Sequence, residues 1–517
     1  MTPFFFEPGR NCSILSSADE AAALVDARCY YRAVHRALRD ARHHVLMTGW
    51  QFHTDVELLR GPDRPDDGSP TALLDLMLAC LEARPELTIH VLAWDYSSVF
   101  ALERQWFQGL RFGEQHPRLH FSWDTHLPSG ASHHQKIVVV DGCYAFTGGM
   151  DVCQARWDTR EHRLDDPMRC SPYGRACKAY HDVQTFVSGE VVRHLEGLFA
   201  ARWLANTGHV LDLPARALRP APLADELLGP EALPLPEGAI AVAETLIPPH
   251  GPLRDGKTEI RDLYGDMVRA AESFIYIENQ YFTSRSLTEA FVERLADETR
   301  PRLSIVIVMP EGGDTPKEKV ALGDAQAFAL AAILEASERH GHACRICYTG
   351  KVDDTGEVSP TFIHSKLMVV DDRLLTIGSA NATNRSFGLD DEVNLAWRAE
   401  TDDARLRIAA FRGSLLAEHA GDLDPRPWLD GAAMVSRVDE AVADPARCLH
   451  RLVIPESKGR DPIVSVFTDP QRPVSGELME ERLDEAWEEI VDDPWWSSRW
   501  EVKGGGVADT PSDEARS

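Results

Sequence analysis

One short pattern occurs twice in this chain and constrains its fold more than any other feature. A histidine is followed two residues later by a lysine, and five residues after that by an aspartate. The first copy is His134, Lys136 and Asp141, and the second is His364, Lys366 and Asp371. In both copies an apolar run links lysine to aspartate, and a glycine turn lies seven residues beyond the aspartate. One copy would be weak evidence, but two copies with matching spacing indicate a duplicated domain.

The residue types in each copy suit a bound phosphate. In an extended chain residues i and i+2 point to the same side, so the imidazole and the ammonium project together. Lysine neutralises an oxyanion, and histidine can attack phosphorus or transfer a proton. The turns that contain Gly148 and Gly149, or Gly378, let a bound group approach the backbone closely. Each copy therefore favours a phosphate site.

Helices and strands are predicted to alternate in the same order around both copies. The motif histidines are 230 residues apart, so the repeat unit is the size of a domain. The predicted pairs of helix and following strand are 30–41 with 45–50, 73–83 with 87–93, 263–272 with 274–277, and 286–295 with 303–309. We expect an α/β fold of two repeated sandwich halves. Each half is a mixed β-sheet flanked by helices, and a pseudo-twofold axis relates them around one shared active site.

Composition changes along the chain predict five segments. An N-terminal half (1–212) leads through a Pro-rich connection (213–240) to a C-terminal half (241–425). Residues 426–502 are rich in tryptophan and acids, which would suit either a membrane-touching surface or an appendage packed on the core. We favour the packed appendage. Residues 503–517 are rich in Gly, Asp and Ser and are predicted to be disordered.

Charge and cysteine content narrow the class of protein. The formal net charge is −28 and the isoelectric point about 5.1, which disfavours a general nucleic-acid binder. The ten cysteines show no small-domain disulfide pattern and suit a reducing cytoplasm. Neither a signal peptide nor a membrane-spanning run is predicted. We therefore expect a cytoplasmic or peripheral membrane protein.

The motif residues resemble the phospholipase D superfamily, whose mark is this duplicated His-Lys-Asp motif. Three further segments resemble its phospholipid-cleaving branch, and the likeness covers roughly residues 8–425. They are 180–183, 275–282 and 378–392. Tyr180 stands where that branch has tryptophan. The first half has Gly149 and Asp151 where the second has Ser379 and Asn381, so the halves are expected to treat phosphate unequally.

The resemblance implies a role for each motif residue. One histidine attacks phosphorus and the other protonates the leaving alcohol; His134 is the expected nucleophile and His364 the expected acid. The sequence alone does not order them. Lys136 and Lys366 would hold the non-bridging oxygens, and Ser379 and Asn381 are expected to add hydrogen bonds to the phosphate.

Acidic residues are needed to orient the two imidazoles. The motif aspartates lie about 15 Å along an extended chain from their lysines, too far to reach the histidine, so we expect them to shape the turn. Acids later in each half match the family pattern better, namely Asp182 for His134 and Glu392 for His364. Glu278 and Gln280 are expected either to line the cleft or to pack beneath it. No metal ligand set stands out, and no cofactor is expected.

These features favour a phospholipase D-type hydrolase that cleaves phospholipid head groups through a covalent phosphohistidine, with transfer to other alcohols as a second outcome. We expect peripheral membrane contact and no nucleic-acid partner. The alternatives are a cardiolipin synthase-like phosphatidyltransferase, a phosphodiesterase acting on nucleic acid, and an inactive phosphate-binding relative. An internal repeat makes one monomer sufficient for one site, while the oligomeric state and head group remain open.

Overall fold

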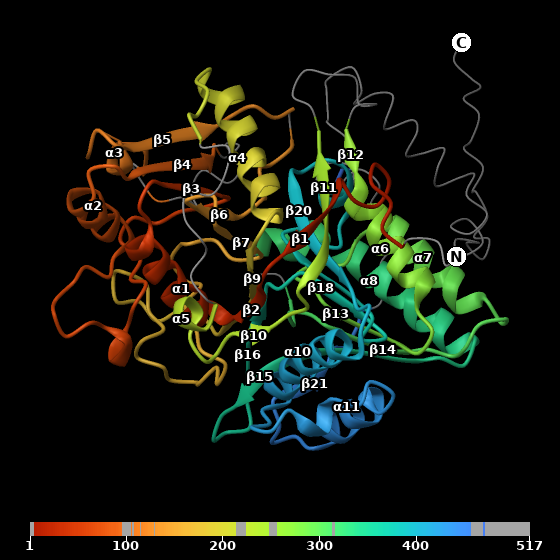
Figure 1. The fold of residues 1–517 in the computed structure, drawn as a ribbon. Helices are drawn as coiled ribbons and strands as arrows, with labels where there is room; N and C mark the ends of the chain where they lie inside the picture. Colours follow the sequence, from red (N-terminus) through yellow and green to blue (C-terminus); the bar gives the residue numbers. More distant parts are fainter. Residues whose placement is uncertain are drawn as a thin grey trace, which may run out of the picture.

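The computed structural model describes residues 5–95, 105, 108–113, 115–128, 130–213, 224–247, 256–312, 316–455 and 469–470. Two large sheets dominate these residues, one in each half of the chain (Figure 1). Their strands are short and apolar, and most are fully buried, as the runs of valine, isoleucine and leucine predict.

The first sheet has eight strands. In spatial order they are β10 (Leu233–Pro234), β2 (Ala21–Val25), β9 (Val183–Ser188), β7 (Tyr144–Gly148), β6 (Ile137–Val140), β3 (His44–Gly49), β4 (Thr88–Trp94) and β5 (Leu119–Asp124). β3, β4 and β5 run parallel, and the remaining pairs are antiparallel. The sheet is therefore mixed.

The second sheet has eleven strands. Its main path is β1 (Ile14–Ala18), β11 (Gly238–Leu246), β20 (Glu392–Arg398), β19 (Leu374–Gly378), β18 (Leu367–Val370), β13 (Phe274–Glu278), β14 (Ser304–Val308), β15 (Ala343–Val352) and β16 (Val358–Pro360). β12 (Lys257–Thr258) pairs with β11, and β21 (Leu449–Arg451) pairs with β15. From β11 to β15 this sheet repeats the seven-strand order that runs from β2 to β5 in the first sheet.

Helices cover the outer faces and a shared core fills the middle. α1 (Asp26–Asp40) and α2 (Leu73–Ala83) pack on the first sheet, and α6 (Glu259–Ala270), α7 (Arg285–Ala296) and α8 (Pro316–Arg339) on the second (Figure 1). The central core joins both sheets with α4 (Val191–Thr207) and α10 (Asp402–Ala420). The other helices are η1 (Gly61–Asp63), α3 (Gln108–Phe112), α5 (Ala224–Leu228), α9 (Asn384–Gly388), η3 (Arg426–Trp428) and α11 (Met434–Ala443). The predicted α/β fold of two repeated halves is confirmed.

The halves exchange their edge strands, which the predicted boundaries missed. β1 lies within the expected N-terminal half but pairs with β11 of the second sheet. β10 lies within the expected connection and pairs with β2 of the first sheet. Each of these two strands therefore joins a sheet outside the segment in which the sequence placed it. A strand's sheet is set by which edge is free to pair, and chain order does not record that.

The start of the expected appendage packs on the second half. Trp428 and α11 belong to the central core, and β21 extends the second sheet. The other tryptophans of that region and the tail from 503 onward lie outside the described residues. Within the described part of the chain, every helix is too short or too polar to cross a membrane.

Candidate active site

The two His-Lys pairs occupy equivalent places in the two halves. Each lies in extended chain directly before a buried strand, β6 in the first half and β18 in the second. Lys136 Nζ donates to the carbonyl oxygen of His134 at 3.0 Å, and Lys366 Nζ donates to that of His364. Each ammonium therefore stays beside its own histidine, as the two-residue spacing predicts.

Each histidine is hydrogen-bonded to a carboxylate from the other half. His134 Nδ1 lies 3.0 Å from Glu392 Oε2, and His364 Nδ1 lies 2.6 Å from Asp182 Oδ2. The prediction that Asp182 orients His134 and Glu392 orients His364 was wrong. Both acids act as expected, but on the opposite imidazole.

Backbone pairing between the halves explains this crossing. β8 (Tyr180–His181) runs parallel to β17 (Phe362–Ile363), and the N–H of His364 donates to the carbonyl of His181 at 2.8 Å. The equivalent N–H of His134 donates to the carbonyl of Asp391 at 2.9 Å. The residue after each acceptor is the orienting acid. These two symmetric contacts complete one site from both halves.

The four motif side chains share one buried electrostatic environment. Burial lowers the pKa of His134 well below its usual range, and the charges of Lys136 and Lys366 lower it further. Burial also lowers the pKa of His364 well below its usual range, with both lysines adding to the effect. Both imidazoles are therefore neutral at rest, which is the state needed for attack through Nε2.

Burial also shifts the pKa of the groups around His364. It raises the pKa of Asp182 to about 6, although the charge of Lys366 opposes the shift. It lowers the pKa of Lys366 to about 7, although Asp182 opposes that shift. Gln280 accepts a hydrogen bond from Lys366 Nζ at 3.0 Å, so Gln280 lies at the site as expected.

These two shifts predict a narrow pH optimum. Below about pH 6 the Asp182 carboxylate takes up a proton and no longer orients His364 as an anion. Above about pH 7 Lys366 loses its positive charge. Burial also raises the pKa of Glu392 well above its usual range, so both orienting acids contribute to the acid limb. We expect kcat/KM to be bell-shaped, with its alkaline limb near the pKa of Lys366. The profile of the free enzyme should be measured with a monomeric substrate.

Arginine provides the matched control for the alkaline limb. Lys366→Arg places a permanently charged group at this position, so its residual activity should not decline near pH 7. An alkaline limb that persists in Lys366→Arg would mean that another group titrates there.

The motif aspartates accept hydrogen bonds from backbone N–H groups and do not face the phosphate site. Asp141 accepts hydrogen bonds from the N–H groups of residues 42, 43 and 44 at 2.7–2.9 Å, immediately before and at the start of β3. Asp371 accepts three hydrogen bonds at 2.8 Å from the N–H groups of residues 272, 273 and 274, immediately before and at the start of β13. Each aspartate thus ties the end of its motif strand to the neighbouring strand, which is the turn-shaping role expected for it.

The glycine turns make room for protein groups instead of a ligand. A side chain at Gly149 would overlap the Asp182 carboxylate, and one at Gly148 would overlap Gln184. At the position equivalent to Gly149, the hydroxyl of Ser379 donates to Glu392. Ser379 therefore positions an orienting acid, contrary to the expected direct bond to phosphate. Asn381 lies buried at the same turn.

Two further residues add to the difference between the halves. Asp151 forms an ion pair of 3.3 Å with Lys136, whereas Lys366 contacts the neutral Gln280. Tyr180 packs its ring 5.4 Å from the ring of His364, where the resembling family has tryptophan. The two ends of the site thus differ in charge and in shape.

Glu278 lies behind the site and does not line it. It accepts hydrogen bonds from His181, His419, Tyr276 and Ser365, and it is fully buried. Ser365 lies between His364 and Lys366, so Glu278 supports the motif from beneath. Of the two expected places for Glu278, lining the cleft and packing beneath it, the structure shows the second.

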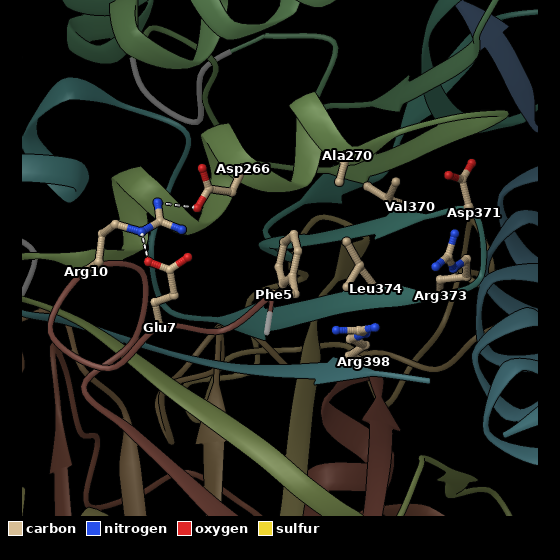
Figure 2. Close-up of a pocket in the computed structure, with 10 residues that line it drawn as sticks. All are labelled: Phe5, Glu7, Arg10, Asp266, Ala270, Val370, Asp371, Arg373, Leu374 and Arg398. Carbon is tan, nitrogen blue, oxygen red and sulfur yellow. Dashed lines mark hydrogen bonds and ion pairs between the residues drawn. The ribbon is translucent and has the colours of Figure 1, made fainter. Parts of the chain in front are cut away.

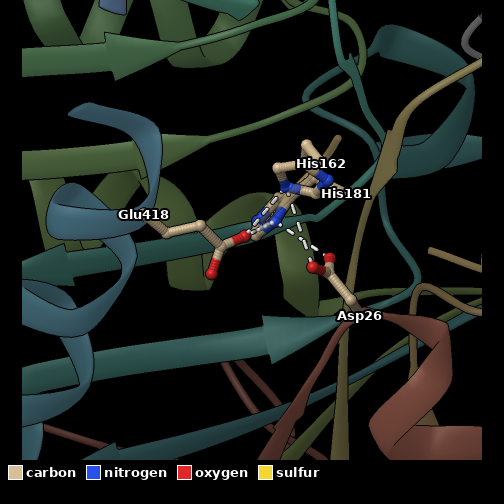
Figure 3. A group of neighbouring side chains, drawn as sticks. All are labelled: Asp26, His162, His181 and Glu418. Carbon is tan, nitrogen blue, oxygen red and sulfur yellow. Dashed lines mark hydrogen bonds and ion pairs between the residues drawn. The ribbon is translucent and has the colours of Figure 1, made fainter. Parts of the chain in front are cut away.

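A cluster of potential metal ligands adjoins Glu278 and was not predicted from the sequence. Asp26, His162, His181 and Glu418 come from four separate segments and point toward one another (Figure 3). Asp158 and Glu278 bind the outer nitrogens of the two histidines at 3.0 and 2.9 Å, an arrangement common around metal-bound imidazoles. These four side chains could hold a divalent ion.

The same cluster can also be explained as a set of ion pairs without a metal. Burial opposes charge on His162, but Asp26, Asp158 and Glu418 outweigh it and raise its pKa to about 10. Glu418 and Glu278 likewise raise the pKa of His181 well above its usual range, against the effect of burial. Two imidazolium groups therefore balance the carboxylates around them.

We expect turnover to survive exhaustive chelation, because Lys136 and Lys366 meet the charge of the phosphate. Activity and the midpoint of thermal unfolding should be measured together after EDTA treatment. A fall in the midpoint alone would indicate a stabilising ion in the cluster. Loss of turnover that one divalent ion restores, at unchanged stability, would contradict the expectation.

A cavity of about 320 Å³ lies on the second half (Figure 2). The motif histidines and lysines are not among the residues that line it. Arg10 at its edge is paired with Glu7 and Asp266, and Asp371 is the motif residue that it touches. Its lining residues are Phe5, Glu7, Arg10, Asp266, Ala270, Val370, Asp371, Arg373, Leu374 and Arg398. It is therefore separate from the phosphate site.

Parts of this sequence match known families and proteins. Residues 37–220 match a family model described as phospholipase D, and residues 264–410 match one described as cardiolipin synthase, PLD-like domain. Phospholipase D alpha 1 of Zea mays is 26% identical over 80% of this chain and 66% of its own length. The Oryza sativa subsp. japonica protein of the same name is 25% identical over 81% and 67%. The chain thus spans about two thirds of the length of these relatives.

A solved structure shows the same fold. The phosphatidylserine synthase of Haemophilus influenzae Rd KW20 aligns with a TM-score of 0.54 and 15% identity, over 84% of this chain and 96% of its own. With two matching family models, a duplicated motif and one site built from both halves, the chain belongs to the phospholipase D superfamily.

Proposed function

We propose that this protein is a phospholipase D-type phosphodiesterase that hydrolyses phospholipid head groups through a covalent phosphohistidine. The crossed pairing of two neutral imidazoles with two buried carboxylates carries the proposal. Covalent catalysis at phosphorus needs a nucleophile on one side and a proton donor on the other. Two imidazoles held in one site by acids of opposite halves meet that need.

In the first step His134 attacks the phosphate. Glu392 Oε2 accepts from Nδ1, so the lone pair of Nε2 is available to form the bond to phosphorus. The bond from phosphorus to the head-group oxygen breaks as His364 passes its proton to that oxygen. Lys136 and Lys366 stabilise the charge on the non-bridging oxygens.

His364 carries the proton for this step only after substrate binds. Its pKa is low in the resting site because of burial and the two lysines. The negative phosphate offsets the lysine charges and favours the protonated ring. In the second step water attacks phosphorus, His364 takes the water proton, and the phosphorus–nitrogen bond to His134 breaks.

Two displacements at phosphorus predict retention of configuration. A substrate made chiral at phosphorus should be reacted with a primary alcohol as acceptor, and the product analysed for its configuration. Each in-line displacement inverts the centre, so the covalent route restores it. Net inversion would mean a single displacement and would contradict the phosphohistidine.

Phosphatidyl transfer is the second candidate, favoured by the synthase-like fold of the solved neighbour. The same covalent intermediate serves both functions, and the outcome depends on whether water or an alcohol enters. Product analysis by mass spectrometry on mixed phospholipid vesicles, with and without an added alcohol, distinguishes them. A parallel nuclease assay tests the nucleic-acid alternative, which the net charge of −28 disfavours.

A further inference from the structure

Asp469 is a buried carboxylate that contacts two segments beside the active site, although it lies 77 residues beyond Glu392 in the chain. Only 4% of its surface is exposed. Oδ1 accepts from the N–H of Arg385 at 2.8 Å. Oδ2 accepts from Asn384 Nδ2 at 2.9 Å, from Asn384 N at 3.2 Å and from the Thr283 hydroxyl at 2.5 Å. Four hydrogen bonds satisfy this buried charge.

The two segments joined by Asp469 lead to different catalytic residues, one to Lys366 and the other to His134. Thr283 lies three residues after Gln280, which accepts from Lys366. Asn384 opens α9, the short helix between Asn381 and Glu392. Asp469 therefore ties the end of the β13 segment to the segment that carries the orienting acid of His134.

The side chain of Arg385 extends this network across to the first half. Its Nε donates to Asp390 Oδ2 at 2.6 Å, and its Nη2 donates to the carbonyl of Gly130 at 3.0 Å. Asp390 accepts in turn from the N–H of Ser132 at 2.8 Å. The network that begins at Asp469 thus ends two residues before His134.

We propose that Asp469 is a positioning residue that fixes residues 381–392 against the β13 segment, so that Glu392 holds His134 in line for attack. Asp469 itself contacts the start of α9 and Thr283, and its hydrogen bonds among the described residues include neither imidazole. Its effect on catalysis is therefore transmitted through the backbone of α9 and through the Arg385–Asp390 pair.

Two variants of the full chain test this role. Asp469→Asn keeps the size of the side chain but turns an amide nitrogen toward groups that donate hydrogen bonds. Thr283→Val removes one of the four bonds and keeps the shape. Asp439→Asn is the matched control, because this carboxylate lies on α11 and pairs with Arg345 of β15, away from the site. Circular dichroism and thermal unfolding should establish that each variant is folded.

The kinetic measurement rests on the proposed function. With a monomeric short-chain phospholipid we expect Asp469→Asn to lower kcat about tenfold or more at a KM changed less than about twofold, because misplacing a catalytic group costs turnover. Thr283→Val should show a smaller fall and Asp439→Asn none. A folded Asp469→Asn protein with wild-type kcat would overturn the proposal.

Hydrogen exchange gives a second measurement that needs no substrate. Deuterium uptake across 381–392 should rise in Asp469→Asn and stay unchanged in Asp439→Asn. Unchanged uptake in Asp469→Asn would overturn the positioning role. If uptake rises as expected while even the wild-type chain cleaves no phospholipid, the positioning role stands and the proposed function fails.

Discussion

Replacing either catalytic histidine should abolish turnover. We expect His134→Asn and His364→Asn each to lower kcat by about 10³-fold or more, because one ring bonds to phosphorus and the other transfers the proton. Asparagine can still donate to the partner carboxylate, so Glu392 or Asp182 is not left without a donor. The alanine variants should lose as much, and the double variant little more than either single one, because the two rings act as a unit.

Controls separate lost chemistry from lost fold. His209→Ala removes an exposed imidazole after α4 and should retain wild-type turnover. Each variant should be compared by thermal unfolding and by a sensitive assay of released head group. If either His134 or His364 variant retains more than about a tenth of wild-type activity, the role assigned to that ring is wrong.

The fold was accessible from sequence because its signals are local. The helix expected at 73–83 is α2 (Leu73–Ala83), and the strand expected at 303–309 contains β14 (Ser304–Val308). Both are apolar runs with the correct period, ended by turn residues. The duplicated motif then predicted that two such halves would share one site. The exchanged strands β1 and β10 were missed because nothing in a strand's own sequence names its partner.

The site could be predicted only in part, because some of its contacts join residues that are far apart in the chain. His134 and Lys136 are neighbours in the chain, so their shared orientation follows from backbone geometry. The partner of His134 is instead decided by the contact of its N–H with the carbonyl of Asp391, 257 residues away. The cluster of Asp26, His162, His181 and Glu418 likewise assembles from four segments. Its members carry no spacing that could reveal it.

The crossed pairs predict that the two orienting acids support different steps of the reaction. In Glu392→Gln the Ser379 carbonyl, 3.0 Å from Nδ1 of His134, still holds the ring tautomer, but the neutral amide cannot offset the positive charge that His134 acquires as it attacks, so attack on phosphorus is disabled. In Asp182→Asn the same change disables His364 as acid and base. With an alkyl leaving group, both variants should lose about 10²-fold or more in kcat.

A substrate with p-nitrophenol as leaving group separates the two steps. This alcohol leaves with little help from an acid, so Asp182→Asn should still form the covalent adduct. Its second step, in which His364 must act as base toward water, stays slow. We therefore expect a burst of about one equivalent of p-nitrophenol per site, with the remaining phosphoryl ester of the substrate bonded to His134. Glu392→Gln should give no burst, because the bond to phosphorus does not form.

Stopped-flow absorbance measures the burst, and mass spectrometry of protein quenched without acid detects the adduct. Wild-type protein is the reference, and Asp439→Asn is the control for a carboxylate lost away from the site. A burst in Glu392→Gln and none in Asp182→Asn would exchange the roles of the two histidines. Equal slow release by both variants, with no adduct in either, would contradict a covalent intermediate altogether. The crossed geometry makes this test possible, because each acid governs one imidazole and each imidazole governs one step.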